Sequence, residues 1–385
     1  MSFKRLFSRA LAAERLHLAA HSHHPWPDVS REAQIEAWDD AARLLDGKWD
    51  RIMGEVWPRA QAEVAAELGL PSPDTVVFAP NTHQLLVSLA SAVERRPVRI
   101  LTTDGEFHSA RRQFKRWAEA GDAVVEWVAT EPFEDFPARF RARAERGGYD
   151  LIAASHVFFG SGRVFEEVFD LAALAAPAGP WLLIDAYHGF MATPTDLGPL
   201  ADRVFYTAGG YKYAMSGEGV AFLHAPPGFG ARPGVTGWYA EFGELTGPPG
   251  GVGYASDATR FFGATFDPSG LYRFNAVRAM LDREGLTTSA ISDHVEALKG
   301  QVIEMAASGA AGRLGRAELL NPPRAGRAAA RFLAFRHPEA PRWHAALEEG
   351  GVITDVRRDV LRVGLGIYHD AADLDRFAAV CRERL

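Results

Sequence analysis

Apolar and polar positions recur along the chain with two periods, which together predict a mixed α/β fold. Residues 31–68 carry apolar side chains at three- and four-residue spacing, as an amphipathic helix does. From residue 75 to residue 225, short apolar runs suited to buried strands alternate with longer helical segments. The connections between the runs are too long for hairpins, so the pattern predicts a mostly parallel sheet covered by helices on both faces.

The segments outside this alternation have a different character. Residues 226–270 are rich in glycine and proline and carry aromatic side chains without a clear period, which is typical of a functional loop or of a segment covering a partner subunit. A long helix and a small α+β unit are expected from about residue 270 onwards. We therefore predict an N-terminal active-site segment at 1–30, a large domain at 31–270 and a small C-terminal domain at 271–385.

Composition narrows the functional classes. The net charge of −7 over 385 residues disfavours a nucleic-acid-binding surface. We expect no membrane partner, because the chain has no apolar run of about 18 residues. The N-terminal residues lack the apolar core of a signal peptide, and a single cysteine, Cys381, excludes an internal disulfide framework. These features favour a cytoplasmic protein, in which Cys381 has a packing role.

Polar side chains gather where the predicted strands end, and open parallel sheets bind their ligands beyond the carboxyl ends of the strands. Asp185 and His188 follow one strand, and Lys212 follows the next in the Gly-rich stretch GGYKYAMSGEG. Other predicted strand ends and helix starts carry Asn81, Thr82, His83, Phe107, Ser109 and Ser155. A helix start of this kind is suited to binding a phosphate group.

A carboxylate, an isolated lysine and a phosphate-ready helix start together suggest pyridoxal phosphate. This cofactor needs an amine for its aldehyde, a carboxylate that keeps its pyridine nitrogen protonated, and donors for its phosphate. Asp185 would supply the carboxylate, and Lys212 the amine that holds the cofactor as an internal aldimine. Small, apolar surroundings favour a neutral, nucleophilic Lys212. Taken singly, Asp185 could instead be a turn residue, Lys212 a solvated charge and His188 a satisfied polar side chain.

Two paired segments, IDAYHGF and FYTAGGYKYAMSGEGVAFLH, resemble the cofactor segments of the kynureninase-like branch of the class V aminotransferase superfamily. The resemblance covers most of the chain and implies fold type I, the aspartate aminotransferase-like fold, with a smaller C-terminal α+β domain. It implies that Lys212 carries pyridoxal phosphate, that Asp185 and His188 belong to the same site, and that Tyr211 contacts the phosphate. It also implies a homodimer with shared active sites.

Shorter motifs extend the resemblance. EFHSARR implies that Phe107 stacks on the cofactor ring, and SHVFFGSG implies that Ser155 lies near the cofactor. TGWYAEFG and GATFDPSG imply that Trp238 meets the phosphate and that Thr265 reaches across the dimer. DVLRVGLGIYH implies that Arg362 grips the α-carboxylate of an amino-acid substrate, a group that suits a bidentate guanidinium.

The start of the chain departs from the family pattern. HLAAHSHHPWPD places Ser22 in the family's substrate-side segment but adds His21, His23 and His24. We expect Ser22 and His23 to contact the substrate.

These histidines also permit a different functional class. In a metallohydrolase, His21, His23 and Asp28 could ligate Zn²⁺ together with Asp185 and His188. Alternate residues of an extended segment face one side, so His21 and His23 could share a metal.

Within the pyridoxal phosphate class, the favoured reaction is kynureninase-like Cβ–Cγ hydrolysis of an amino acid bound as an external aldimine. An aminotransferase, an epimerase or a C–S lyase would use the same site. A desulfurase is disfavoured because no cysteine lies in a mid-chain loop. A non-catalytic relative that binds the cofactor only as structure is a further alternative.

Overall fold

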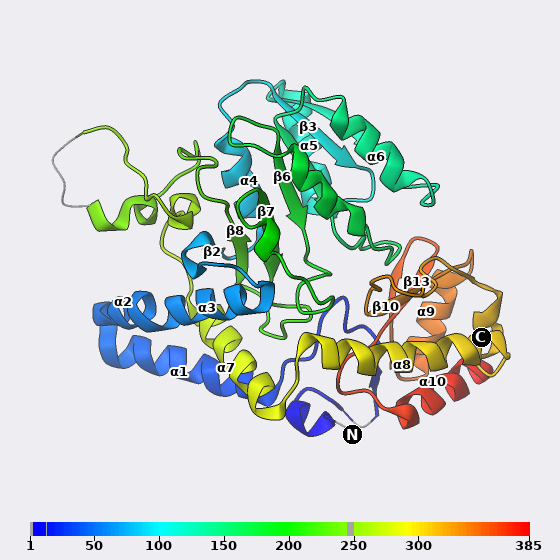
Figure 1. Cartoon of the computed structure of the whole chain (residues 1–385). Helices are drawn as coiled ribbons and strands as arrows, with labels where there is room; N and C mark the ends of the chain where they lie inside the picture. Colours follow the sequence, from blue (N-terminus) through cyan, green and yellow to red (C-terminus); the bar gives the residue numbers. More distant parts are fainter. Residues whose placement is uncertain (1–2, 13, 245–249) are drawn as a thin grey trace.

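The core of the protein is a seven-stranded sheet with the strand order β2-β8-β7-β6-β5-β3-β4 (Figure 1). The computed structural model describes residues 3–12, 14–244 and 250–385. The strands of the large sheet are β2 (Val76–Ala79), β3 (Val98–Thr103), β4 (Ala123–Val128), β5 (Leu151–Ser155), β6 (Trp181–Asp185), β7 (Val204–Gly209) and β8 (Ala221–His224). Neighbours run parallel, except that β8 is antiparallel to both β2 and β7. The predicted mostly parallel sheet is confirmed.

Helices pack around this sheet. They are α1 (Asp28–Leu44), α2 (Lys48–Arg51), α3 (Trp57–Leu68), α4 (Thr82–Ser91), α5 (His108–Ala120), α6 (Phe136–Glu145) and α7 (Ser269–Glu284). Both α1 and α3 contact α7, as Figure 1 shows. Among the residues that the structure describes, no helix is long and apolar enough to cross a membrane.

The single helix predicted for residues 31–68 is wrong in its continuity. After α1 the chain turns at Leu45, whose φ of 51° cannot continue a right-handed helix. A π-helical turn at Ile52–Val56 then leads into α3. One of the helical segments expected between residues 75 and 225, at 166–179, is likewise shorter, a 3-10 helix over Glu166–Leu174. Apolar periodicity predicts that a segment is helical more reliably than it predicts where the axis breaks.

The C-terminal part of the chain forms a second, antiparallel sheet of four strands in the order β12-β13-β10-β9. Its strands are β9 (Glu318–Leu319), β10 (Phe332–Arg336), β12 (Asp355–Arg357) and β13 (Val360–Gly364), accompanied by α8 (Thr288–Ala307), α9 (Ala340–Glu349) and α10 (Ala371–Arg384).

The N-terminal segment joins the small sheet region to the large one. β1 (Leu16–His17) pairs in parallel with β11 (Val352–Ile353), and Ala19 bridges to Gly364. A few residues later, the His24 amide donates to the carbonyl of Tyr211 at 3.3 Å. The histidine-rich segment therefore contacts both the small sheet and the loop that carries Lys212.

Candidate active site

A cavity of about 230 Å³ lies where β5, β6 and β7 end. Strand register aligns the three ends, because Ser155 pairs with Asp185 and Asp185 pairs with Thr207. The predicted site residues that line this cavity are Asn81, Thr82, His83, Phe107, Ser109, Ser155, Asp185, His188, Tyr211 and Lys212. Residues from five separate stretches of the sequence are thus brought to one place.

Lys212 is oriented inside the cavity by His188. The lysine Nζ lies 2.8 Å from His188 Nε2 and 4.7 Å from the centroid of the Tyr187 ring. Burial, partly offset by the charge of Asp185, lowers the pKa of Lys212 to about 7. Burial also lowers the pKa of His188 and so favours the neutral imidazole. When Lys212 is protonated, it donates to Nε2, and Nδ1 then carries the imidazole hydrogen. Within the described residues, that Nδ1 has no hydrogen-bond partner.

Asp185 presents a carboxylate to the same cavity. The Tyr187 amide donates to its Oδ1 at 3.1 Å. Burial raises the pKa of Asp185, although the Lys212 charge opposes this shift. A carboxylate removed from water is stable in its ionised form only beside a positive charge. Asp185 is therefore suited to balance a cationic group held in the cavity.

Sequence reasoning missed Glu106, a second carboxyl group close to Asp185. Glu106 is 3% exposed and accepts hydrogen bonds from Ser155 Oγ (2.6 Å), the Ser155 amide (3.1 Å) and Thr103 Oγ1 (2.6 Å). Burial, reinforced by the charge of Asp185, raises the pKa of Glu106 to about 7. The Ser155 hydroxyl hydrogen is thus committed to Glu106. The sequence EFHSARR does not reveal that Glu106 is buried, because nothing in that stretch distinguishes its carboxyl from the charged side chains nearby.

The opposite side of the cavity is built from helix starts and an aromatic ring. Asn81 caps α4 by accepting from the Gln84 amide at 3.0 Å. His83, in the first turn of α4, has a buried Nδ1 that is unpaired among the described residues. Phe107, just before α5, is 38% exposed and its ring centroid lies 5.7 Å from Lys212 Nζ. This side therefore offers a flat apolar surface and unused polar atoms.

Two predicted cofactor residues do not reach this cavity within one chain. Trp238 is 44% exposed in the 3-10 segment Trp238–Glu244. Thr265 lines an adjacent apolar cleft of about 320 Å³, which shares Pro80 and His83 with the Lys212 cavity. The resemblance implies that Trp238 meets the phosphate and that Thr265 reaches across the dimer, and a single chain does not test either role.

Arg362 lies behind the cavity wall, not on its lining. Its Nη1 donates to the carbonyl of Phe159, a lining residue, and its Nε and Nη2 donate to Asp355 Oδ1 at 3.2 and 2.8 Å. Arg362 is 2% exposed. The guanidinium predicted to bind a substrate carboxylate is therefore already paired with a carboxylate of the protein.

The N-terminal histidines point into different surroundings. His23 is exposed, with Nε2 3.6 Å from Glu218 Oε1 and its ring 5.5 Å from Tyr211. His24 is buried, with Nδ1 2.9 Å from the Pro25 carbonyl. His21 is fully buried and stacks on Phe332 at 4.6 Å, and both its ring nitrogens lack partners in the described chain.

The metallohydrolase alternative therefore has no ligand set. Among residues 3–12, 14–244 and 250–385, no group of three His, Cys, Asp or Glu side chains could hold a metal ion. Asp28 instead accepts hydrogen bonds from Ser8 and the Arg9 amide. Ser22, the other predicted substrate residue, is half-buried beside His23 and does not line the Lys212 cavity.

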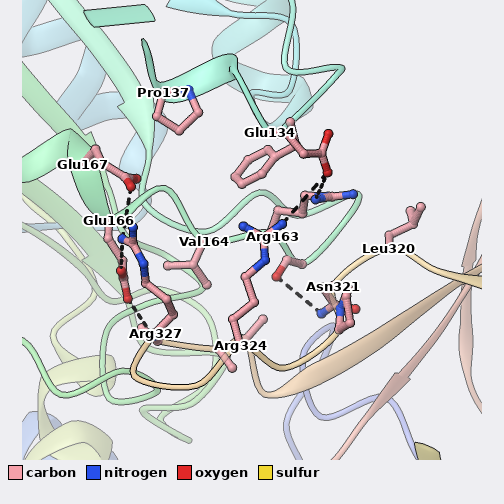
Figure 2. Close-up of a pocket in the computed structure, with 16 residues that line it drawn as sticks. Glu134, Pro137, Arg163, Val164, Glu166, Glu167, Leu320, Asn321, Arg324 and Arg327 are labelled. Carbon is pink, nitrogen blue, oxygen red and sulfur yellow. Dashed lines mark hydrogen bonds and ion pairs between the residues drawn. The ribbon is translucent and has the colours of Figure 1, made fainter.

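A second cavity, of about 170 Å³, is lined by arginines and glutamates (Figure 2). Its arginines face glutamates: Arg163 Nη1 lies 3.4 Å from Glu134, and Arg327 Nη1 lies 2.6 Å from Glu166. Its described lining includes no lysine, histidine or cysteine. We therefore identify the Lys212 cavity as the candidate active site.

Known structures share this fold. The cysteine desulfurase from Thermococcus onnurineus NA1 superposes with a TM-score of 0.80 at 18% identity, covering 100% of this chain and 98% of that one. A variant of C-DES, with glycine covalently linked to its pyridoxal phosphate cofactor, gives a TM-score of 0.80 at 16% identity over 100% of both chains. The Escherichia coli cysteine desulfurase CsdA gives 0.77 at 17% identity, covering 99% and 97%.

These likenesses confirm the predicted fold class, the fold type I architecture of pyridoxal phosphate enzymes. At such low identity they establish the fold alone. No protein-family model and no curated protein matches the chain.

Proposed function

We propose that this protein is a pyridoxal phosphate-dependent enzyme that acts on an amino acid, with Lys212 as the residue that binds the cofactor. The observation that carries the proposal is a buried lysine, with its pKa lowered to about 7 mainly by burial, in one cavity with Asp185 and His188. A lysine of this kind is a nucleophilic amine near neutral pH. The shared fold with C-DES, which carries this cofactor, supports the proposal.

The residues of the cavity fit the cofactor. His83 Nδ1 and His188 Nδ1 are buried polar atoms unpaired within the described chain, and such atoms are expected to have partners in the working enzyme. Lys212 would hold the aldehyde carbon, Asp185 the pyridine nitrogen, and the start of α4 the phosphate. When bound, pyridoxal phosphate supplies an electron sink for charge that develops at the α-carbon of an amino acid.

The protein's own residues supply orientation and proton transfer. Lys212 can take up and return a proton near neutral pH, because burial brings its pKa to about 7. His188 orients the amine through Nε2 at 2.8 Å. Arg362 is proposed to bind the substrate α-carboxylate. Three of the five guanidinium N–H groups are used by Asp355 and Phe159, which leaves one on each terminal nitrogen.

For the reaction, we propose kynureninase-like Cβ–Cγ hydrolysis first, because the segments around Asp185 and Lys212 resemble that branch. Such hydrolysis needs a general acid near the β-substituent. Tyr213 is a candidate, since it follows Lys212, is 2% exposed and has a hydroxyl with no partner among the described residues. Burial raises its pKa and so keeps the phenol protonated.

A C–S lyase is the second candidate, favoured by the likeness to C-DES, which is described as a cystine C–S lyase (TM-score 0.78, 18% identity). Elimination of sulfur needs no thiol from the enzyme. A desulfurase that receives sulfur on its own cysteine is not proposed. Cys381 is buried in α10, burial raises its pKa to about 12, and it does not line the cavity.

Two measurements test the proposal. Adding pyridoxal phosphate should produce a visible absorption band, and borohydride should abolish the band and leave a covalent adduct on the peptide containing Lys212. Product formation from L-kynurenine, 3-hydroxy-L-kynurenine and L-cystine, with and without an oxo-acid acceptor, should then distinguish hydrolysis, C–S cleavage and transamination. A colourless protein whose activity is lost to a chelator would overturn the proposal.

We further propose a homodimer whose interface lies near the active site. Trp238 and Val235 are 44% and 52% exposed, and Val235 borders the apolar cleft that contains Thr265. Large exposed apolar groups beside a cleft are typical of interaction surfaces. Light scattering that finds only monomer at micromolar concentration would contradict this assembly.

A further inference from the structure

Asp355 is shared between two arginines behind the cavity wall. Its Oδ1 accepts from Nε and Nη2 of Arg362, and its Oδ2 lies 3.2 Å from Nη2 of Arg357. The register of the small sheet produces this contact, because Asp355 on β12 pairs directly with Arg362 on β13. Arg362 and Asp355 are 2% and 8% exposed, so solvent screens their charges weakly.

The charge balance of this trio explains why two arginines are present. Arg362 with Asp355 alone is a neutral pair, which has little attraction for a further carboxylate. Arg357 adds one positive charge, so the trio carries a net charge of about +1. That is the charge that one substrate α-carboxylate would neutralise, while Asp355 remains in place and holds the Arg362 side chain.

The positive charge of Arg357 reaches the cavity. It is among the charges that lower the pKa of Lys212, after burial and Arg362, and it also acts on Tyr211. The adjacent Arg358 differs, because it makes no ion pair with any described residue and its backbone has φ 54°. The two arginines are neighbours in sequence, yet only Arg357 contacts Asp355.

We propose that Arg357 is a positioning residue for substrate binding: it neutralises Asp355 so that the positive charge of Arg362 remains available to the α-carboxylate of an amino acid. This proposal rests on the proposed function and names a specificity element of the same site. It assigns to Arg357 an electrostatic role that requires its charge and no contact with the substrate.

The test compares a ligand that has an α-carboxylate with one that lacks it. L-Alanine and ethylamine are titrated into the cofactor-loaded protein, and dissociation constants are taken from the change in the visible band. Arg357→Gln should weaken L-alanine binding by roughly fivefold, since the lost charge stands on a side chain that is 46% exposed and is partly screened by solvent. Ethylamine binding should stay within about twofold, because it has no carboxylate to respond.

Three further variants separate charge from structure. Arg357→Lys keeps the charge and should bind L-alanine nearly as wild type does. The double substitution Arg357→Gln with Asp355→Asn restores the net charge and leaves an oxygen for Arg362, so it should recover most of the lost affinity. Arg358→Gln is the matched control, an exposed neighbour without the Asp355 contact, and should have no effect.

A pH titration of the visible band gives an independent readout. The pKa of Lys212 responds to the charges of four residues, Asp185, Arg362, Arg357 and Asp355. The His188 ring, at 2.8 Å, also faces the amine. Loss of the Arg357 charge should move the midpoint of the band to higher pH, and Arg358→Gln should not move it. A purely structural role for Arg357 would leave this midpoint unchanged.

A failure of the Arg357 proposal can be distinguished from a failure of the cofactor proposal. If no band forms in wild type, the cofactor proposal fails. If the band forms but Arg357→Gln weakens L-alanine and ethylamine equally, or Arg357→Lys behaves like Arg357→Gln, the proposed role of Arg357 is overturned. Selective loss for L-alanine, with recovery in the lysine variant, supports it even if the double variant is too unstable to purify.

Discussion

The lining of the candidate site and the small-sheet residues behind it treat charge in opposite ways. On the large sheet, Lys212 and Asp185 face the cavity, and His188 Nδ1 has no partner within the described chain. On the small sheet, Arg362 and Asp355 face each other and use most of their hydrogen-bonding capacity internally. Lys212, Asp185 and His188 thus have polar atoms available for a ligand, whereas the charge of Arg362 is held in position by the protein.

This difference matches what each set of residues must do: the cavity lining must react with a ligand, and the residues behind it must hold a charge in place. A reactive group needs a shifted pKa and an atom that remains available to a ligand. Lys212, buried beyond the end of β7, meets both needs. A buried arginine without a carboxylate would be costly before substrate arrives, so Asp355 stabilises Arg362 in the empty site.

Lys212→Ala should abolish covalent cofactor binding and reduce turnover by about a thousandfold or more, because no other lysine of the described residues lines the cavity. The visible band and mass spectrometry of the borohydride-treated protein measure this. Lys115→Ala, at an exposed position on α5, is the control and should retain both. A Lys212→Ala protein that kept the band would show that the reactive amine lies elsewhere.

Asp185→Asn should lower turnover by about a hundredfold while leaving the fold intact, because a neutral amide cannot balance a cationic ring nitrogen. Rates at saturating substrate, together with the melting temperature, separate chemistry from stability. Near-full turnover in this variant would show that the carboxylate is not part of the electron sink.

Gly364→Ala should destabilise the protein by about 1–3 kcal/mol, because the added methyl group must displace a packed ring. A Cβ built at Gly364 lies 2.1 Å from His21 Nδ1. The control is Gly300→Ala in α8, where a Cβ meets nothing within 4 Å and alanine favours the helix. Chemical denaturation compares the two variants, and equal stabilities would contradict the packing of His21 against β13.

Lowering the pH should reduce the free energy of unfolding through the buried histidines beside the small sheet before it protonates the carboxylates of the ion pairs. Burial lowers the pKa of His17 to about 4 and of His24 and His369 to about 3. Each imidazole is neutral in both states above about pH 6.5, so its stability contribution is complete there. As the pH falls below that value, the unfolded chain binds protons first and stability is lost, by on the order of 2 kcal/mol per histidine at pH 5. Melting temperatures that are equal at about pH 7 and pH 5 would contradict this.

His23→Ala should change stability by less than about 0.5 kcal/mol, because the side chain is 73% exposed and its 3.6 Å contact with Glu218 lies on the surface. Denaturation and the L-alanine titration both measure it. A large loss of ligand affinity with unchanged stability would instead support the predicted contact of His23 with substrate.

Adjacency along the chain explains which site residues could be predicted. Asp185 is the last residue of the buried strand β6, His188 lies three residues later, and Lys212 lies three residues after the neighbouring strand β7. An apolar strand followed by polar residues is visible in sequence, and parallel neighbours bring their carboxyl ends together. The starts of α4 and α5 were predictable for the same reason.

Glu106, Asp355 and Arg357 were not predictable in this way. Each belongs to a short charged stretch whose members look alike in sequence, and only packing determines which member is buried. Glu106 is 3% exposed against Ser155, whereas Asp104, two residues earlier, is exposed. The three N-terminal histidines likewise share one motif yet occupy three environments.

By itself, the sequence determined the mostly parallel sheet, the strand ends that carry Lys212 and Asp185, and the kind of chemistry those side chains can perform. These features depend on periodicity and on residues close together in the chain. Only the tertiary structure decided which charges neutralise one another. Arg362 meets Asp355 through the register of the adjacent strands β12 and β13, and it meets Phe159 in the turn after β5, 203 residues away in sequence. Burial and pairing of this kind depend on packing that a sequence pattern does not show.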